Sequence, residues 1–345
     1  MNHSQPNALK WRTTDEEQRQ GKYPELEMVI VTLQKCICVY IPIGVVGNII
    51  SFLATASKDN RKISVCVYMS ALSVVDTMVL LTQGAYLLLN FILSTESSTQ
   101  EVQVASNVQQ YIWYSNNTFG MLSGLFLAMM STDRAIAIQF PFRAKSICTP
   151  LNAKKAIILV SFIPAALNIN LFFTYRTQQD TLTGSITEVL DYPNPKWVET
   201  VVGLYILLFG TIFPFTVIIF CNTLIILNVQ KASRRRQKMD AANKPGTTGE
   251  KENHLTRMLI LVSLTYLILS IPLRLSTVVF KIPELAKMYD LTDDYWQLRL
   301  YLVKMVLFTL WTLNFAVNFY MYLLGGGQKF RNETKKVFAQ ACKRA

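Results

Sequence analysis

The sequence predicts an all-α integral membrane protein built as a bundle of seven transmembrane helices. Composition is the first observation, because 51% of the 345 residues are hydrophobic and only 16% are charged, which is too apolar for an ordinary soluble domain. The second is a series of seven apolar stretches, each long enough to cross a hydrocarbon core of roughly 30 Å. The third is a regular alternation of basic and acidic connections between these stretches.

The seven predicted spans follow one another in a single bundle at 28–324. They are placed near 28–57, 63–93, 108–140, 152–175, 197–230, 255–281 and 299–324. Residues 1–27 lack a basic start followed by an apolar core, so we expect an extracellular segment without a cleaved signal peptide. Residues 325–345 predict a cytosolic amphipathic helix and a short tail, with Phe330, Val337 and Phe338 facing membrane lipid.

The connections between the spans indicate how the chain is oriented. Lys and Arg gather after spans one, three, five and seven, as in KDNRK and KASRRRQK, whereas the opposite connections hold most of the acidic residues. Because basic residues resist translocation, we expect the N-terminus outside and the C-terminus in the cytosol. The net charge of +12 then reflects topology and attraction to anionic lipid, and we do not interpret it as a nucleic-acid-binding surface.

Several polar residues interrupt the apolar spans, and each must face the bundle interior or water because lipid cannot satisfy it. Asp76 stands alone in the apolar run ALSVVDTMVLL of span two, and span one carries Asn48. Span seven has polar residues at intervals of four, at Asn314, Asn318 and Tyr322. We expect these side chains to be neighbours in the core, beside a stripe along span three made of Asn116, Gly120, Ser123, Leu127, Met130 and Arg134.

An ordered set of motifs runs from Met28 to Phe338. Each motif is weak alone, and the set consists of Gly47 with Asn48, LSVVD ending at Asp76, DRA from Asp133 with Pro141, Pro214, Pro272, and NFYMY from Asn318 to Tyr322. In this order the motifs resemble the rhodopsin-like G-protein-coupled receptors. The resemblance implies a non-enzymatic receptor of the plasma membrane, without a cofactor, whose partners are an extracellular ligand, a heterotrimeric G protein and arrestin.

The resemblance also assigns roles at the cytosolic end of span three. Asp133 and Arg134 resemble the acid and arginine that couple the bundle to the G protein, and Glu252 matches a second acid that pairs with this arginine at rest. Pro141 and Tyr322 belong to the same coupling region. A guanidinium between two carboxylates is a two-state element that helix movement can break. The alternative is an interfacial salt bridge with no signalling role.

A second set of residues matches the position where the family binds a sodium ion inside the bundle. The set comprises Asp76, Ser123, Asn314 and Asn318, with Asn48 beside them. Hard oxygen ligands around a buried carboxylate suit such an ion. The alternative is a hydrogen-bonded network that joins the helices without any ion.

The sequence departs from the usual family pattern at several positions. No cysteine stands near Gln109 in span three, so the usual loop disulfide is not expected. At four other positions the residue differs from the one that is common in the family, namely at Ala135, Asn222, Ser270 and Phe319. These departures indicate a divergent branch that resembles invertebrate neuropeptide or chemosensory receptors, and they leave open a receptor that has lost its coupling.

The ligand class is predicted mainly by exclusion. An amine is disfavoured because Asn116 stands where amine receptors keep an aspartate, and retinal is disfavoured because Thr312 replaces the opsin lysine. A neuropeptide is favoured, with a small chemosensory molecule as the alternative. Arg274, a cation inside span six, is the leading candidate for a ligand contact, unless it pairs with an acid of the outer loops. The candidates that could line the same pocket are Gln83, Tyr86, Asn116 and Lys304.

Two modification sites and one alternative class complete the predictions. Asn2 lies in an accessible glycosylation sequon, and Cys342 is a candidate for palmitoylation. A transporter or membrane enzyme would require inverted repeats, broken helices or clustered metal ligands in the spans. The sequence has no visible repeat, and His3 and His254 both lie outside the predicted spans.

Overall fold

The computed structural model describes residues 24–95, 99–169, 175–179, 186–190, 201, 204–205, 207–239, 247–279 and 294–342. Within these residues, seven helices are long and apolar enough to cross a membrane. The candidate spans are Pro24–Thr55, Ser64–Leu89, Val108–Gln139, Pro150–Asn168, Leu208–Lys231, Thr256–Ser276 and Arg299–Gly325. The predicted fold class, an all-helical bundle with seven spans and a short C-terminal helix, is therefore confirmed.

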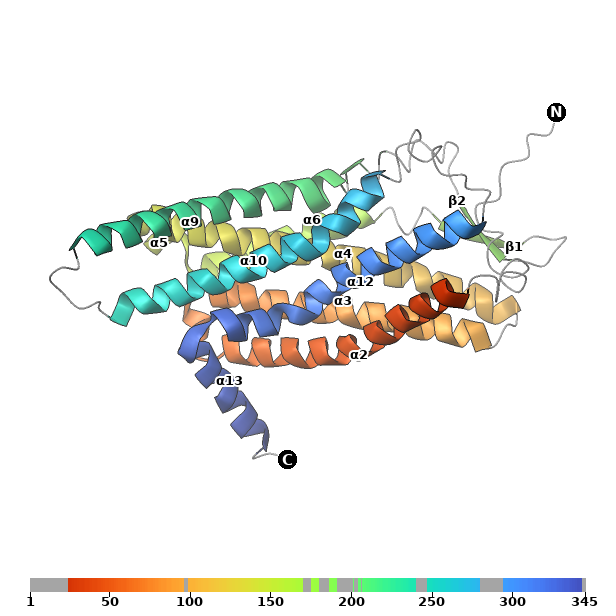
Figure 1. Ribbon diagram of the computed structural model, residues 1–345, viewed down its shortest axis with the longest axis horizontal. Coiled ribbons are helices and arrows are strands. Elements are labelled where there is room, and N and C mark those ends of the chain that lie inside the picture. The colour runs from red at the N-terminus through yellow and green to blue at the C-terminus, as the bar shows by residue number, and fades with distance from the viewer. Residues whose placement is uncertain are drawn as a thin grey trace.

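The spans belong to long helices that run side by side along the longest axis of the molecule (Figure 1). These helices are α2 (Pro24–Thr55), α3 (Ser64–Thr95), α4 (Thr99–Gln139), α6 (Pro150–Asn168), α9 (Phe213–Met239), α10 (Thr247–Val279) and α12 (Asp294–Gly325). A π-helical turn, η2 (Leu208–Ile212), leads directly into α9. The turn lies just before Pro214, which has no backbone N–H for the regular helical bond, so the local distortion has a covalent cause.

The two ends of the bundle carry different short elements. At one end lie η1 (Asn60–Lys62), α5 (Pro141–Ile147) and α13 (Gly327–Cys342), and we call it the α13 end. At the other end β1 (Tyr175–Gln179) pairs antiparallel with β2 (Ile186–Leu190), with Tyr175 opposite Leu190, and we call it the hairpin end. Figure 1 shows α2 beginning at the hairpin end of the bundle.

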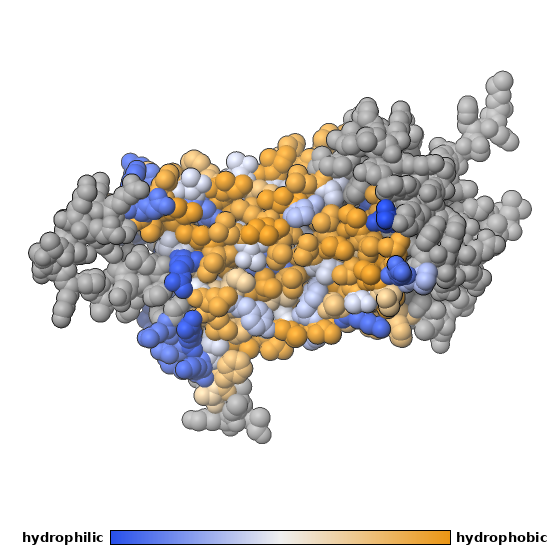
Figure 2. Space-filling model, in the orientation of Figure 1, coloured by the Kyte–Doolittle hydropathy of each residue, from blue (hydrophilic) through white to orange (hydrophobic). Residues whose placement is uncertain are grey.

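The flank of the bundle is hydrophobic and its rims are not. Figure 2 shows an apolar band along the helices, bordered by hydrophilic residues toward the α13 end. In the candidate spans, Leu159, Phe162 and Ile268 expose 71%, 69% and 67% of their surface. Side chains of this size and exposure are compatible with lipid and incompatible with water as the surrounding medium.

The fourth span can be compared with its predicted range only as far as Ile169, because residues 170–174 lie outside the described residues. The apolar run suggested a helix to about residue 175, whereas α6 ends at Asn168. Two tyrosine hydroxyls donate hydrogen bonds to carbonyl groups near the end of α6. Tyr114 donates to Ala165 at 3.2 Å, and Tyr205 donates to Leu167 at 2.5 Å. These bonds satisfy acceptors that a helix end leaves open, and a hydropathy window cannot detect them.

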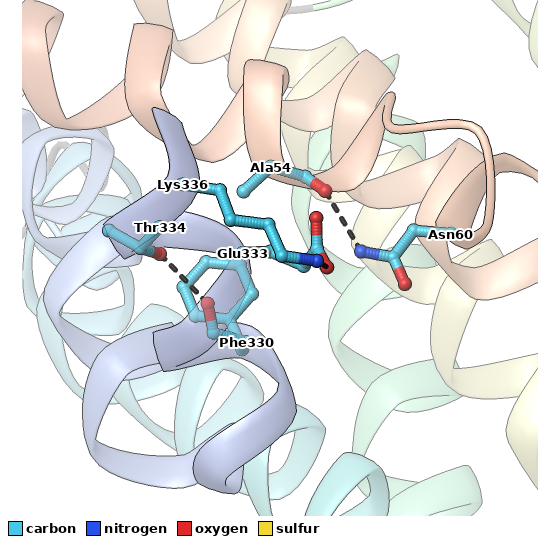
Figure 3. A network of polar contacts seen from close by, with 6 residues as sticks. All are labelled: Ala54, Asn60, Phe330, Glu333, Thr334 and Lys336. Atoms are coloured by element: carbon cyan, nitrogen blue, oxygen red, sulfur yellow. Dashed lines mark hydrogen bonds and ion pairs between the residues drawn. The ribbon is translucent and has the colours of Figure 1, made fainter. Parts of the chain in front are cut away.

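At the α13 end, α13 turns away from the bundle and runs beside the connection between α2 and α3 (Figure 3). Asn60 closes this connection by donating from Nδ2 to the carbonyl of Ala54 at 2.9 Å. Phe330 anchors the start of α13, since it is buried and its ring meets that of Tyr322 edge-on at 5.8 Å. On the side of α13 that faces this connection, Lys336 donates to Glu333 at 2.7 Å.

Candidate functional site

Asp133 and Arg134 lie in the last two turns of α4, at the α13 end. Asp133 is partly buried, and its Oδ2 accepts a hydrogen bond of 2.8 Å from the Oγ of Ser64, the first residue of α3. The guanidinium of Arg134 attracts the same carboxylate. The carboxylate thus accepts a hydrogen bond from the neighbouring helix and is favoured by the charge of a cation on its own helix, and movement of α3 against α4 would change that balance.

Cys148 and Pro141 complete the surroundings of this pair. The Sγ of Cys148, which caps the C-terminal end of α5, donates to the backbone oxygen of Asp133 at 3.4 Å. Burial, followed by the negative charge of Asp133, raises the pKa of Cys148 to about 11, so the thiol keeps its proton at neutral pH. Pro141 is exposed at the first position of α5, and the restriction it places on Phe140 explains why α4 ends at Gln139.

Two other residues of the predicted coupling region differ in how far the structure describes them. Glu252 lies on the described backbone of α10, but its side chain lies outside the described residues, so its pairing with Arg134 stays a prediction. Tyr322 is fully buried near the end of α12. Among the described residues, its hydroxyl has no hydrogen-bond partner. A phenol with this unmet capacity can bond to a group that a helix movement brings near.

Close contact joins α10 to the end of α12 at the same end of the bundle. The Nη2 of Arg257 donates to the carbonyl of Leu324 at 3.3 Å. A Cβ atom on Gly325 would lie 2.5 Å from the Cα of Met258, which is shorter than any real contact of that kind. Only glycine therefore fits between the two helices at this position.

Asp76 lies in the middle of the bundle with no exposed surface. Its Oδ1 accepts a hydrogen bond of 2.7 Å from the Oγ of Ser123, and its Oδ2 accepts one of 2.5 Å from the Nδ2 of Asn318. The structure thus brings together three predicted residues from α3, α4 and α12. Asn48 of α2 adds a fourth helix, because its Nδ2 donates to the carbonyl of Phe315 at 3.0 Å.

Two asparagines of the predicted polar core keep unused hydrogen-bonding groups. Among the described residues, both side-chain polar atoms of the buried Asn314 and the Oδ1 of Asn48 lack a hydrogen-bond partner. A buried carboxylate with nearby amide and hydroxyl oxygens is a donor set that a small monovalent cation accepts. The residues therefore fit a sodium ion, which would be held by Asp76, Ser123, Asn314 and Asn318.

Toward the hairpin end, Arg274 of α10 lies over the ring of Trp311 of α12, with 5.5 Å between the guanidinium carbon and the ring centroid. Trp311 is buried and packs with Phe315 edge-on at 5.0 Å. A Cβ atom on Gly120 would lie 2.9 Å from the Trp311 ring, so α4 also contacts this indole closely. The cation is thus oriented by an aromatic face that is itself fixed by packing.

The remaining predicted pocket residues occupy different places. Gln83 is buried and has no hydrogen-bond partner among the described residues. Asn116 turns toward α3, where its Nδ2 donates to the Oγ1 of Thr82 at 3.1 Å. Tyr86 meets the ring of Trp113 edge-on at 5.8 Å, and Lys304 is exposed on α12. The contacts of Asn116 and Tyr86 therefore lie at the boundary of α3 and α4, which differs from the shared pocket that the sequence suggested.

The side chains of the two predicted modification sites lie outside the described residues. Asn2 lies outside the described residues. Cys342 is the last residue of α13, and its side chain also lies outside them. Both modifications stay predictions.

Sequence reasoning missed Ser64 and Trp311. Ser64 follows a basic connection and has no motif around it, and its partner Asp133 is 69 positions away. Trp311 stands in an apolar run next to Thr312, where an aromatic residue is unremarkable. Its proximity to Arg274 could have been anticipated only by assuming that spans six and seven are neighbours.

Comparison with known proteins adds independent observations. The family model described as seven transmembrane receptor (rhodopsin family) matches residues 47–306, which is more than half of the chain. The chain is also 28% identical over 246 residues to a Caenorhabditis elegans protein described as a probable G-protein coupled receptor. This match covers 69% of the chain and 55% of the nematode protein, so the chain spans about half the length of that relative.

Proposed function

Because this chain belongs to the rhodopsin family of seven-transmembrane receptors, we propose that it is a plasma-membrane receptor that binds an extracellular ligand and activates a heterotrimeric G protein. The α13 end faces the cytosol in this proposal, in agreement with the basic connections that the sequence places there. Arrestin would bind the same face. Membership of a receptor family also favours this function over the transporter considered from the sequence.

The observation that carries the proposal is the environment of Asp133 and Arg134. The carboxylate is bonded to Ser64 and attracted to Arg134 at the boundary of the bundle, where a modest helix shift can exchange its partners. Tyr322 offers a buried hydroxyl with unmet hydrogen-bonding capacity at the same end. In the proposed mechanism, ligand binding favours a state in which α10 separates from α12 and opens a cytosolic cleft.

The ligand we propose is a neuropeptide that presents a carboxylate or another anionic group. The supporting observation is Arg274, a cation in a membrane-spanning helix, held over Trp311 toward the hairpin end. A guanidinium in such a position suits a bidentate anionic partner. A small acidic chemosensory molecule would use the same chemistry, so it is the second candidate.

Sodium would act on the resting state in this proposal. Bound by Asp76, Ser123, Asn314 and Asn318, the ion would supply positive charge next to a buried carboxylate. Asn318 and Ser123 hold that carboxylate in place from two helices. The alternative, a network without an ion, differs in having no dependence of ligand affinity on sodium concentration.

The experiment is G-protein activation in cells that express the chain, with several G-protein subtypes read in parallel. Amidated and acidic peptides would be screened together with small odorant-like acids. An active ligand identifies the class, and Arg274→Ala and Arg274→Lys then test the contact with the anionic group. A ligand that acts equally on Arg274→Ala would remove Arg274 from the binding site.

The coupling role is tested by Arg134→Ala at matched surface expression. We expect ligand-driven G-protein activation to fall by at least about tenfold, because the cation can no longer exchange partners at the cytosolic end. Arg143→Ala is the control, since Arg143 is an exposed arginine on the adjacent α5. Intact activation in Arg134→Ala, or an equal loss in Arg143→Ala, would contradict the proposed role.

A further inference from the structure

Ser270 of α10 and Asn314 of α12 carry buried polar atoms with unmet hydrogen-bonding capacity. Both residues expose 1% of their surface. Among the described residues, the Oγ of Ser270 and both the Nδ2 and the Oδ1 of Asn314 lack a hydrogen-bond partner. An unmet polar group inside a membrane-spanning bundle costs free energy, because lipid cannot replace the missing bond. These three atoms therefore point to a partner that a bound molecule supplies.

Other hydroxyls of the same two helices are satisfied within their own helix. Bonds of 2.6 to 2.8 Å to backbone carbonyl groups are made by Ser263 and Ser276 of α10 and by Thr309 and Thr312 of α12. A serine or threonine of a membrane helix is commonly satisfied in this way. Ser270 lies between the two serines of α10 and makes no such bond, so its hydroxyl is available to a bound molecule.

The register of α10 against α12 brings the two unmet residues to the same interface. Toward the α13 end Met258 lies against Gly325, and toward the hairpin end Arg274 lies over Trp311. Between these contacts α10 advances from 258 to 274 while α12 returns from 325 to 311, so the two helices are antiparallel and closely in register. The same register places the two unmet residues opposite each other, four residues from Arg274 and three from Trp311.

The unmet groups lie one helical turn below the proposed contact for an anionic ligand group. Ser270 precedes Arg274 by four residues, or roughly 6 Å along the helix. On the other side, Asn318 follows Asn314 by four residues and donates to Asp76. The pair therefore lies between a cation toward the hairpin end and a carboxylate toward the α13 end.

We propose that Ser270 and Asn314 form a deeper part of the ligand site and bind a neutral primary amide of the ligand. The amide oxygen accepts from the Nδ2 of Asn314, and the amide nitrogen donates to the Oδ1 of Asn314 and to the Oγ of Ser270. Where this Oδ1 turns toward a sodium ion, the Nδ2 and Ser270 still offer one donor and one acceptor. The inference rests on the proposed receptor function, because it extends the site of Arg274. It specifies a ligand with an anionic group and, roughly 6 Å away, a neutral amide.

Charge and geometry disfavour other small polar groups at this position. A second carboxylate of the ligand would lie one turn from the bond between Asn318 and Asp76, and the two negative charges would repel each other. An ammonium group would lie one turn from the guanidinium of Arg274. A hydroxyl or a water presents a single oxygen atom, which cannot lie in line with both the N–H and the oxygen of the Asn314 amide. A second amide makes these two bonds in parallel.

The test measures binding of small probes to the purified full chain in detergent, without any G protein. The probes are N-acetyl dipeptides that begin with aspartate, which supplies the anionic group, followed by each residue type in turn. Each is prepared as a primary amide, a dimethylamide and a free acid. We expect at least one primary amide to bind, with its dimethylamide and free acid at least about tenfold weaker.

A further probe distinguishes the source of the amide. N-acetyl-aspartyl-glutamine with a methyl-ester terminus carries the primary amide on a side chain, so its affinity relative to the terminal amides shows which source the site prefers. Equal binding of a primary amide and its dimethylamide, or no binding by any amide probe, would overturn the inference.

Ser270→Ala and Asn314→Leu test the two residues. We expect Asn314→Leu to abolish the preference for the primary amide over its dimethylamide, and Ser270→Ala to reduce it about threefold. Ser263→Ala is the matched control, because that hydroxyl is already bonded within α10, and the preference should stay unchanged. An unchanged preference in Asn314→Leu would overturn the inference.

Thermal unfolding without any probe separates binding from folding. Both variants remove buried polar atoms that lack a partner among the described residues, so we expect midpoints equal to or above that of the original chain. A lower midpoint with an unchanged amide preference would assign the pair to an ordered water and overturn the ligand contact. Amide binding without G-protein activation would contradict the proposed function and leave this inference intact. A peptide that activates the G protein without any preference for the amide would overturn this inference alone.

Discussion

Two aspartates of this bundle, Asp76 and Asp133, have opposite surroundings. Asp76 has no exposed surface, and each of its oxygens accepts a hydrogen bond from a different helix. Asp133 is partly exposed at the α13 end, with one oxygen bonded to Ser64 and a cation next to it in sequence. In the low-dielectric interior a satisfied carboxylate rigidifies its neighbours, while at the boundary water and a mobile cation can replace a partner.

The difference suggests that the two carboxylates have different roles. The Asp76 contacts tie α3, α4 and α12 together, so removing them should mainly change stability. Removing the Asp133 contacts should lower stability only slightly, but it should shift the balance between two states of the bundle. Substitutions at both sites test this difference in roles, and the largest loss of stability is expected in the interior.

Asp76→Ala should lower the free energy of unfolding by about 3 kcal/mol, because Ser123 and Asn318 would be left with unmet donors in the core. The measurement is the thermal unfolding midpoint of purified protein in detergent. Asp76→Asn is the control, since an amide keeps the shape and one acceptor, and its loss should be smaller. Equal midpoints for Asp76→Ala and the original chain would mean that these bonds do not hold the helices.

Replacing Gly325 tests the close contact between α10 and α12. Gly325→Ala places a methyl group against the backbone of Met258, so we expect a loss of about 2 kcal/mol and a partial separation of α10 from α12. Basal G-protein activation should rise at the same time. Gly84→Ala is the matched control, because the nearest atom to a Cβ there is 3.9 Å away. A rise in basal activity with Gly84→Ala would contradict the assignment to the α10 contact.

Ser64→Ala should have a small effect on stability, about 1 kcal/mol or less, because Asp133 remains partly hydrated and close to Arg134. Its effect should instead appear in signalling. Without the Ser64 bond the carboxylate is less constrained, and we expect basal G-protein activation to change by severalfold. Ser146→Ala serves as control, since that hydroxyl is exposed and bonds only within α5. A decrease of the thermal unfolding midpoint as large as that of Asp76→Ala would contradict the different roles proposed for the interior and the boundary.

Lys336→Ala should have the smallest effect. The Lys336 side chain is exposed on α13, and the hydrogen bond to Glu333 raises the pKa of Lys336. Exposed pairs of this kind contribute little to folding because water and salt screen them. We expect no measurable change of the unfolding midpoint. A clear loss would indicate that α13 depends on this pair for its position beside the α2–α3 connection (Figure 3).

The polar core was the part of the site most open to prediction from sequence. Asp76, Ser123 and Asn318 could be placed together because each is a polar residue in an apolar span and the spacing fixes its face. The pocket residues were less predictable. Asn116 has the same kind of polarity, yet its amide is used by Thr82 at the α3–α4 boundary, and no periodicity distinguishes these two outcomes.

The sequence by itself determined that this chain is a seven-span helical membrane protein, because hydropathy over about 20 residues is a local property set by the bilayer thickness. It also determined which spans carry polar groups. Only the tertiary structure decided that Ser64 bonds to Asp133, that Arg274 lies over Trp311, and that Gly325 packs against Met258. These contacts depend on the rotation and approach of helices that are distant in sequence, and such geometry is set by the packing of the whole bundle.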